Sequence, residues 1–198
     1  GPAFLYLSFD RLSRAGRSRL GDAENLALAA LFAFGTVYWF SSVQGTVWFA
    51  AHTVGVALAS VYIYASLDAA QPVLAGLALA LGFATRTPLG FAFPLFLFEA
   101  YRAASGDDAP PEAALAPRLG RADLRSLADR LLRFGSPIGL VLAVLLWHNR
   151  ARFGDPFEFG HRFLAIGWRA RIDRWGLFSY HYLGRNLAVI GTSLPYTQ

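Results

Sequence analysis

Residues 25–67 read NLALAALFAFGTVYWFSSVQGTVWFAAHTVGVALASVYIYASL, 43 positions without one Asp, Glu, Lys or Arg. As a single helix this stretch would measure about 65 Å, roughly twice the thickness of the hydrocarbon core of a bilayer. It must therefore fold back, and the polar run at 41–46 (SSVQGT) is the predicted turn. We expect membrane spans near 26–41 and 46–67, with the aromatic residues beside the turn at the membrane interface.

Composition also favours a membrane protein. Hydrophobic residues make up 55% of the chain and charged residues 16%, whereas a soluble domain carries about 25% charged residues. The basic residues are all Arg and stand between apolar runs, so the net charge of +5 indicates membrane lipids as partners and not nucleic acid. The chain has no Cys and four dispersed His, which excludes a disulfide and argues against a zinc cluster.

Both ends of the chain read as interior sequence. Residues 1–7 resemble the tail of an earlier helix, with no initiator Met and no charged signal segment before them. Residues 195–198 carry no polar tail. We therefore expect the chain to be truncated at both ends.

The apolar region 72–101 is interrupted once, at Thr85-Arg86-Thr87-Pro88. As one span it would be about 45 Å long and kinked, with Arg86 in mid-membrane. As a hairpin of half-helices, 72–84 and 88–101, each arm would cover only about 20 Å. Short arms are tolerated where protein encloses them and their tip lines a polar cavity, so the residues favour the hairpin.

The rest of the chain alternates between polar and apolar segments. Residues 104–118 are predicted to be a flexible cytoplasmic loop, 121–134 an interfacial amphipathic helix, and 136–149 the next span. Residues 150–198, rich in Arg and aromatic residues, are predicted to form an extracytoplasmic loop with short helices, one near 177–190. The fold class is therefore all-α: a polytopic transmembrane helical bundle of about five membrane helices or half-helices.

The distribution of Arg does not favour the hairpin. With a hairpin, 10 Arg lie inside and 8 outside; with a single span, 11 lie inside and 6 outside. Because cytoplasmic loops are usually enriched in basic residues, an Arg-rich outer loop requires its own explanation, such as an anionic lipid ligand.

Several stretches resemble the C-type membrane glycosyltransferases, above all bacterial relatives of protein O-mannosyltransferases and of aminoarabinose transferase. The resemblance rests on residues 76–88 (GLALALGFATRTP) with 91–95 (FAFPL), on 149–160 (NRARFGDPFEFG), and on 178–182 (FSYHY). It covers most of residues 20–190 at the level of pattern.

The resemblance implies a pair of short helices at 72–101, with Arg86 and residues 150–190 on the extracytoplasmic face of a bacterial inner membrane. It also implies transfer of a sugar from a polyprenyl-phosphate donor to an acceptor, with inversion at the anomeric carbon. A divalent metal would be compatible with this chemistry, although no cofactor is required by the residues present. The family's main carboxylate is expected before Gly1, so this chain alone is expected to be inactive.

Arg86 is the leading candidate to bind the donor phosphate, because its planar fork of donors suits a phosphate. The alternative is an Arg that reaches the headgroups from a short helix. Arg150, Arg152 and Arg162 are candidates to add positive potential there, with headgroup contact as the alternative. Glu158 is a candidate catalytic carboxylate, whereas Asp155 precedes Pro and is more typical of a turn.

Further candidates are assigned to substrate binding. His52 shares a helix face with Trp48, four residues before it, and a polar residue in an apolar span usually faces the bundle interior or a cavity. A structural hydrogen bond is the alternative for His52, and an interfacial aromatic role is the alternative for the other His residues. The other candidates for substrate binding are His161, Tyr180, His181, Arg185 and Asn186.

Two other functions remain open. A transporter or flippase also uses broken helices with a charged residue at the break, and a non-catalytic membrane scaffold would not need Arg86. The chain contains none of the phosphate-loop, dinucleotide, zinc-protease or serine-hydrolase motifs.

Overall fold

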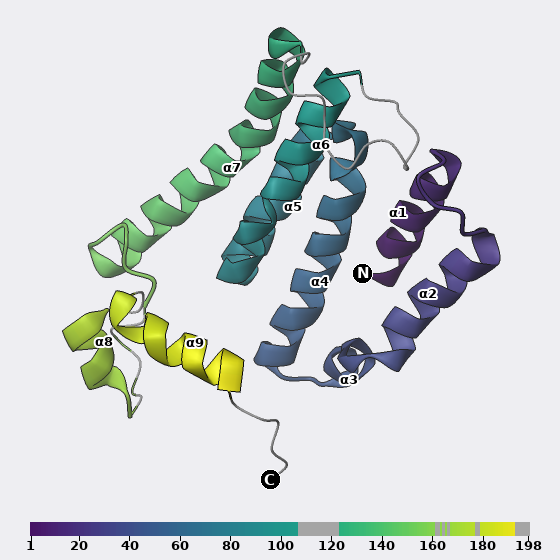
Figure 1. The fold of residues 1–198 in the computed structure, drawn as a ribbon. Helices are drawn as coiled ribbons and strands as arrows, with labels where there is room; N and C mark the ends of the chain where they lie inside the picture. The colour runs from purple at the N-terminus through teal and green to yellow at the C-terminus, as the bar shows by residue number, and fades with distance from the viewer. Residues whose placement is uncertain (107–122, 161–162, 164, 166, 177–178, 193–198) are drawn as a thin grey trace. The chain divides into compact units, whose positions relative to one another are not determined.

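A computed structural model of the protein describes residues 1–106, 123–160, 163, 165, 167–176 and 179–192 (Figure 1). These residues form helices and connecting segments, with no strand among them, which confirms the all-α prediction. The chain divides into two compact units, residues 1–145 and 146–198. Each unit is described by itself.

The first unit begins with α1 (Pro2–Arg14), α2 (Asp22–Gly35), α3 (Val37–Val43), α4 (Val47–Ser66) and the short η1 (Leu67–Ala69). It continues with α5 (Pro72–Thr85), η2 (Thr87–Ala92), α6 (Pro94–Ala104) and the first part of α7 (Leu124–Phe153). Pro2, Pro72 and Pro94 each stand in the first turn of a helix, where the missing N–H has no partner to lose. The helical tail expected at residues 1–7 is part of α1, which continues to Arg14 and packs against α2 and α4.

The span predicted at 26–41 is not one straight helix. α2 ends at Gly35, α3 begins at Val37, and the two helices are bent by 56°. Thr36 between them has extended backbone angles, and its hydroxyl donates to the Phe32 carbonyl at 2.7 Å and accepts from the Tyr38 N–H. The Thr36 side chain thus provides hydrogen-bond partners for a carbonyl and an N–H group that the bend leaves outside the helical hydrogen-bond pattern.

Residues 72–101 turn back, as the hairpin predicts. The tip is η2, where a Cβ added to Gly90 would lie 2.8 Å from the Phe83 ring, so the two arms approach closely. At the other end, Glu99 of α6 accepts the N–H of Asp68 in η1 at 2.7 Å, which places the end of α6 beside the start of α5. A single kinked span over 72–101 is therefore wrong.

Helix α7 corrects a second prediction, since the interfacial helix at 121–134 and the span at 136–149 are one 30-residue helix. Pro137 removes the hydrogen bond to the Arg133 carbonyl, and the Ser136 hydroxyl donates to that carbonyl at 3.2 Å instead. Gly76 of α5 packs against the same turn, because an added Cβ would lie 2.0 Å from the Phe134 carbonyl oxygen. The proline is thus accommodated inside the helix and does not end it.

The core of the first unit consists mostly of small residues between α4, α5, α6 and α7. Ala65, Ala75 and Ala100 are fully buried, and the rings of Phe96 and Phe134 stack at 4.0 Å. Small residues allow helix backbones to approach closely, which is the packing found between membrane helices.

Two of the described helices are long and apolar enough to cross a membrane: α4 continued by η1 (Val47–Ala69), and α7. The bent pair α2 and α3 would make a third if it forms one span, whereas α5 is shorter, at 14 residues. Their apolar side chains are largely exposed, with Leu31 at 62%, Val47 at 83% and Leu140 at 67%. Such exposure is typical of helices that face lipid.

The second unit contains the end of α7, then α8 (Arg169–Trp175), η4 (Tyr180–Tyr182) and α9 (Leu183–Thr192). The predicted short helix near 177–190 therefore begins later, at Leu183, and ends at Thr192. In the segment predicted as a flexible loop, α6 continues to Ala104, and residues 107–118 lie outside the described part.

Candidate functional site

Arg86 occupies the turn between α5 and η2, at the tip of the hairpin. α5 ends at Thr85, and Arg86 has extended backbone angles (φ −146°, ψ 106°). Pro88 follows in the first turn of η2 and disfavours continuation of α5. The sequence therefore places a guanidinium on the connection between two short apolar helices.

The Arg86 side chain turns toward α4. Its Nη2 lies 2.6 Å from His52 Nε2 and 3.4 Å from the Trp48 carbonyl oxygen, and its guanidinium lies 6.0 Å from the centre of the Trp48 indole. Because a guanidinium only donates, His52 Nε2 is the acceptor in this contact. Among the described residues, the hydrogen-bond partners of Arg86 are therefore an imidazole nitrogen and a carbonyl oxygen, and neither is a carboxylate.

Room for this arrangement comes from Gly55, one turn beyond His52 on α4. A Cβ added there would lie 3.1 Å from Leu89 and 3.8 Å from the Arg86 stem. Arg86 Nε is buried and has no hydrogen-bond partner among the described residues. A buried donor without a partner is uncommon in a folded protein.

The sequence analysis placed Trp48 and His52 on one helix face but did not place Arg86 beside them. The structure brings the three together, with Trp48 and His52 exposed and Arg86 half-buried. We refer to these three residues as the tip site.

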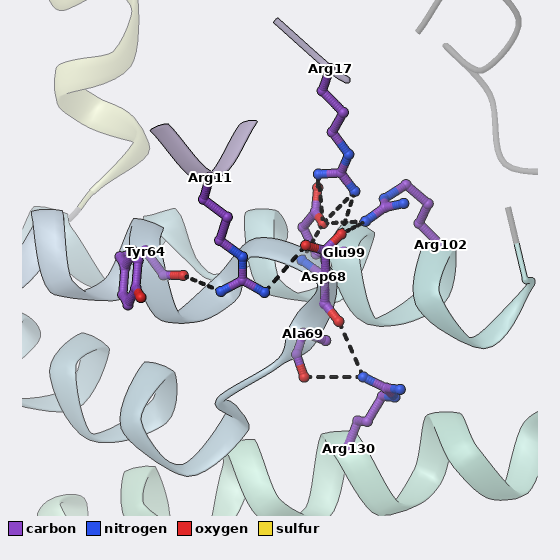
Figure 2. A network of polar contacts seen from close by, with 8 residues as sticks. All are labelled: Arg11, Arg17, Tyr64, Asp68, Ala69, Glu99, Arg102 and Arg130. Atoms are coloured by element: carbon purple, nitrogen blue, oxygen red, sulfur yellow. Dashed lines mark hydrogen bonds and ion pairs between the residues drawn. The ribbon is translucent and has the colours of Figure 1, made fainter. Parts of the chain in front are cut away.

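A second group of Arg residues lies at the other end of the hairpin, and the sequence analysis did not predict it (Figure 2). We refer to it as the arginine–carboxylate cluster, which consists of Arg11, Arg17, Asp68, Glu99, Arg102 and Arg130. Glu99 is buried and lies 2.9 Å from Arg102 and 3.4 Å from Arg17. Asp68 pairs with Arg11 at 3.2 Å, with Arg17 at 2.7 Å, and with Arg102.

The arginine–carboxylate cluster holds an unusual turn. Asp68 and Ala69 have φ angles of 55° and 47°, a region that favours glycine. Glu99 accepts the Asp68 N–H, while Arg130 donates to the carbonyls of Asp68 and Ala69 at 3.2 Å and 3.1 Å (Figure 2). The side chains therefore satisfy the backbone groups of this turn and hold it in a strained conformation.

One sequence signal could have indicated this cluster. Glu99 is the only acidic residue between Asp68 and Asp107, and it stands within an apolar segment. An ionisable residue in such a segment usually has a partner of opposite charge. Its partners lie up to 82 positions away, so no local pattern identifies them.

In the second unit, residues 149–160 form a turn held by its own side chains. Asn149 donates to the Pro156 carbonyl at 3.1 Å, and Arg150 donates to the Gly154 carbonyl at 2.6 Å. Asp155 accepts the Phe157 N–H at 2.9 Å, as expected of a turn residue. Glu158 is buried and accepts the Gly160 N–H at 2.8 Å, which gives its carboxylate a structural role in the same turn.

Arg152 lies over the Phe153 ring at 5.1 Å. Arg150 and Arg152 belong to the second unit and Arg86 to the first, so their joint action on one phosphate stays a prediction. His161 and Arg162 lie outside the described residues.

The remaining candidates gather around two neighbouring hollows of the second unit. Tyr180 and Asn186 line the larger one, of about 610 Å³. His181, Arg185 and Asn186 line the other, of about 460 Å³. The structure thus brings together four residues that were selected from the sequence pattern.

No group of three or more His, Cys, Asp or Glu side chains suited to a metal ion occurs within the part of the chain that the structure describes. The described residues therefore provide no ligand set for the divalent metal that the resemblance allows.

No protein-family profile, curated protein or solved structure matches the chain.

Proposed function

We propose that this chain is part of a multi-pass bacterial inner-membrane glycosyltransferase that takes a sugar from a polyprenyl-phosphate donor and transfers it to an extracytoplasmic acceptor. The observation that carries the proposal is Arg86, a half-buried guanidinium at the tip of a hairpin. Its hydrogen-bond partners among the described residues are an imidazole nitrogen and a carbonyl oxygen, not a carboxylate. The resemblance of residues 76–88 to C-type glycosyltransferases supports the same assignment.

The chemistry asks for a cation where the donor phosphate departs. The acceptor hydroxyl oxygen forms a bond to the anomeric carbon while the bond from that carbon to the phosphate oxygen breaks. The phosphate leaves with the electron pair, and the hydroxyl proton passes to a carboxylate base. A fixed guanidinium stabilises the negative charge that develops on the phosphate, and its planar fork can donate two parallel hydrogen bonds.

The environment of Arg86 supports this role over contact with headgroups alone. The side chain is held by His52 and the Trp48 carbonyl and passes through the space that Gly55 leaves. A phosphate at the tip site would therefore meet a guanidinium whose orientation is fixed by α4.

The test is sugar transfer by the complete protein in proteoliposomes, with polyprenyl-phosphate sugars, comparing the wild type with Arg86→Ala. We expect transfer to fall a hundredfold or more, which is the usual effect of removing one donor that stabilises a developing anion. Arg86→Lys keeps the charge but not the planar fork, so its transfer rate should lie between those of the wild type and Arg86→Ala.

Arg133→Ala is the matched control, because Arg133 is an exposed Arg paired with Asp129 at 2.9 Å. It should transfer at the wild-type rate. Arg86→Ala must also keep the wild-type thermal unfolding profile. Transfer unchanged by Arg86→Ala, or absent with every donor in the wild type, would contradict the proposal.

A transporter or flippase is the second candidate. The 56° bend between α2 and α3 and the reversal at Arg86 are two broken helices, which are frequent in transporters. Movement of a polyprenyl-phosphate sugar across the proteoliposome membrane without transfer would favour this candidate.

A further inference from the structure

The larger hollow of the second unit is built from three short elements. It has a volume of about 610 Å³ and lies between α8, η4 and α9. Its walls are mostly aromatic and apolar, with a few polar side chains among them; the lining residues used below are Trp168, Arg171, Tyr180, Tyr182 and Asn186. A site with this balance of apolar wall and few polar groups is typical of small-molecule binding.

Specific contacts fix the wall of the hollow. The Tyr182 hydroxyl lies 3.2 Å from the Arg171 carbonyl and 3.1 Å from the Gly176 carbonyl, which ties η4 to α8. The rings of Trp175 and His181 stack at 3.9 Å with 2° between their planes. Gly176 has a φ of 75°, which allows the chain to leave α8 and return toward η4.

Exposed aromatic rings stand beside this fixed wall. Trp168 is 53% exposed and Tyr180 is 93% exposed. Aromatic rings that remain open in a hollow offer flat apolar faces together with a polar edge. The C–H face of a sugar ring packs against such a surface, while its hydroxyl groups remain free to form hydrogen bonds.

Three cationic or amide side chains complete the hollows. Arg171 and Asn186 line both of them, and Arg185 lines the smaller one. No side-chain hydrogen bond or ion pair of these three residues occurs among the described parts of the chain. Two guanidinium groups select a carboxylate or a phosphate, and an amide suits a hydroxyl.

We propose that these two hollows bind an anionic saccharide, held by Trp168 and Tyr180 through its apolar face and by Arg171, Arg185 and Asn186 through its polar groups. The further assignment of this saccharide as the acceptor of the enzyme rests on the proposed glycosyltransferase function. Saccharide binding itself depends only on the two hollows.

The experiment measures saccharide binding by the complete protein in detergent, using isothermal titration calorimetry. The probes are a hexuronate-containing tetrasaccharide and its carboxyl-reduced, neutral counterpart. The charged tetrasaccharide should bind at least about tenfold more tightly, since a hydrogen bond to a charged group contributes about 1.5–3 kcal/mol.

Arg171→Gln should weaken binding of the charged probe about tenfold or more and leave the neutral probe unchanged. Arg169→Gln is the matched control, because Arg169 lies on the same helix, pairs with Asp173 at 3.8 Å and does not line the hollow. Tyr180→Ala tests the aromatic wall. Because Tyr180 is 93% exposed, its substitution should leave the fold intact, so a loss of binding would not be due to unfolding.

Equal affinity for both tetrasaccharides, or equal effects of Arg171→Gln and Arg169→Gln, would overturn the proposal. Absence of saccharide binding together with attachment to phosphatidylglycerol vesicles would assign these residues to the membrane surface instead. Saccharide binding without any sugar transfer would contradict the proposed glycosyltransferase function but support the saccharide site. Sugar transfer without saccharide binding would contradict the saccharide site but support the glycosyltransferase function.

Discussion

The two ends of the α5–α6 hairpin both hold arginine, but in opposite electrostatic settings. At the base, the carboxylates of Asp68 and Glu99 pair with Arg11, Arg17 and Arg102. At the tip, the partners of Arg86 among the described residues are an imidazole and a carbonyl oxygen. The base therefore holds its cations with charges from the chain itself, whereas the tip leaves a cation available to an anion from outside.

This difference separates a structural role from a binding role. Arg86 is half-buried and has no carboxylate partner among the described residues, so it adds little ion-pair energy to the folded state. The base should govern the free energy of unfolding, and the tip should govern ligand binding with little effect on unfolding. The following predictions test this separation, in order of expected effect.

Glu99→Ala should have the largest effect on stability. It removes the buried partner of Arg17 and Arg102 and the acceptor of the Asp68 N–H. Breaking a buried ion pair from one side lowers the free energy of unfolding by about 3–5 kcal/mol. Denaturant unfolding of the complete protein in detergent, followed by circular dichroism, measures the change.

Asp129→Ala is the control for Glu99→Ala, since Asp129 forms an exposed ion pair with Arg133 and should change stability by less than about 1 kcal/mol. If Arg86→Ala destabilised the protein as much as Glu99→Ala, the separation between base and tip would be wrong.

Gly76→Ala should destabilise the contact between α5 and α7. The added Cβ would lie 2.0 Å from the Phe134 carbonyl oxygen and 2.8 Å from Pro137 Cγ, so α5 and α7 would have to move apart. Overpacking of this kind lowers stability by about 1–3 kcal/mol. The thermal unfolding midpoint in detergent provides the measurement.

Gly139→Ala on α7 is its matched control, because nothing lies within 4 Å of the added Cβ. An exposed Gly→Ala change inside a helix should stabilise by about 0.5–1 kcal/mol. Destabilisation by both variants would show that the contact between Gly76 and α7 is not the cause.

His52→Ala should have the smallest effect and should act on binding alone. It removes the acceptor that holds Arg86 Nη2 at 2.6 Å but leaves the guanidinium in place. We expect affinity for a polyprenyl-phosphate sugar to fall about five- to tenfold, which corresponds to one hydrogen bond of about 1 kcal/mol. His52→Gln, which restores an acceptor, should recover most of the affinity. Loss of affinity as large as that of Arg86→Ala would make His52 a direct ligand.

Local sequence patterns predicted the helices that begin and end at strong signals. Helix α4 and the reversal at Arg86 follow from the turn at 41–46 and from Thr85-Arg86-Thr87-Pro88. Pro137 was misread as a helix boundary, because the Ser136 hydrogen bond and the contact with Gly76 that accommodate it involve tertiary structure.

The candidate site was predicted only in part, for the same reason. Arg86 and His52 were selected separately, since the 34 positions between them carry no signal of their contact. The arginine–carboxylate cluster was missed because its members come from four helices and the segments joining them. Sequence identified the charged residues, but only the fold shows which of them already have partners.

The arginine–carboxylate cluster also sets an order of events during synthesis. Arg130 follows Asp68 by 62 positions, and at about 5–20 residues per second the ribosome needs roughly 3–12 seconds to add that length. Through this interval the turn at Asp68 and Ala69 has no Arg130 to hold its carbonyls. The turn at Asp68 and Ala69 therefore gains these two backbone hydrogen bonds only after α7 has been made.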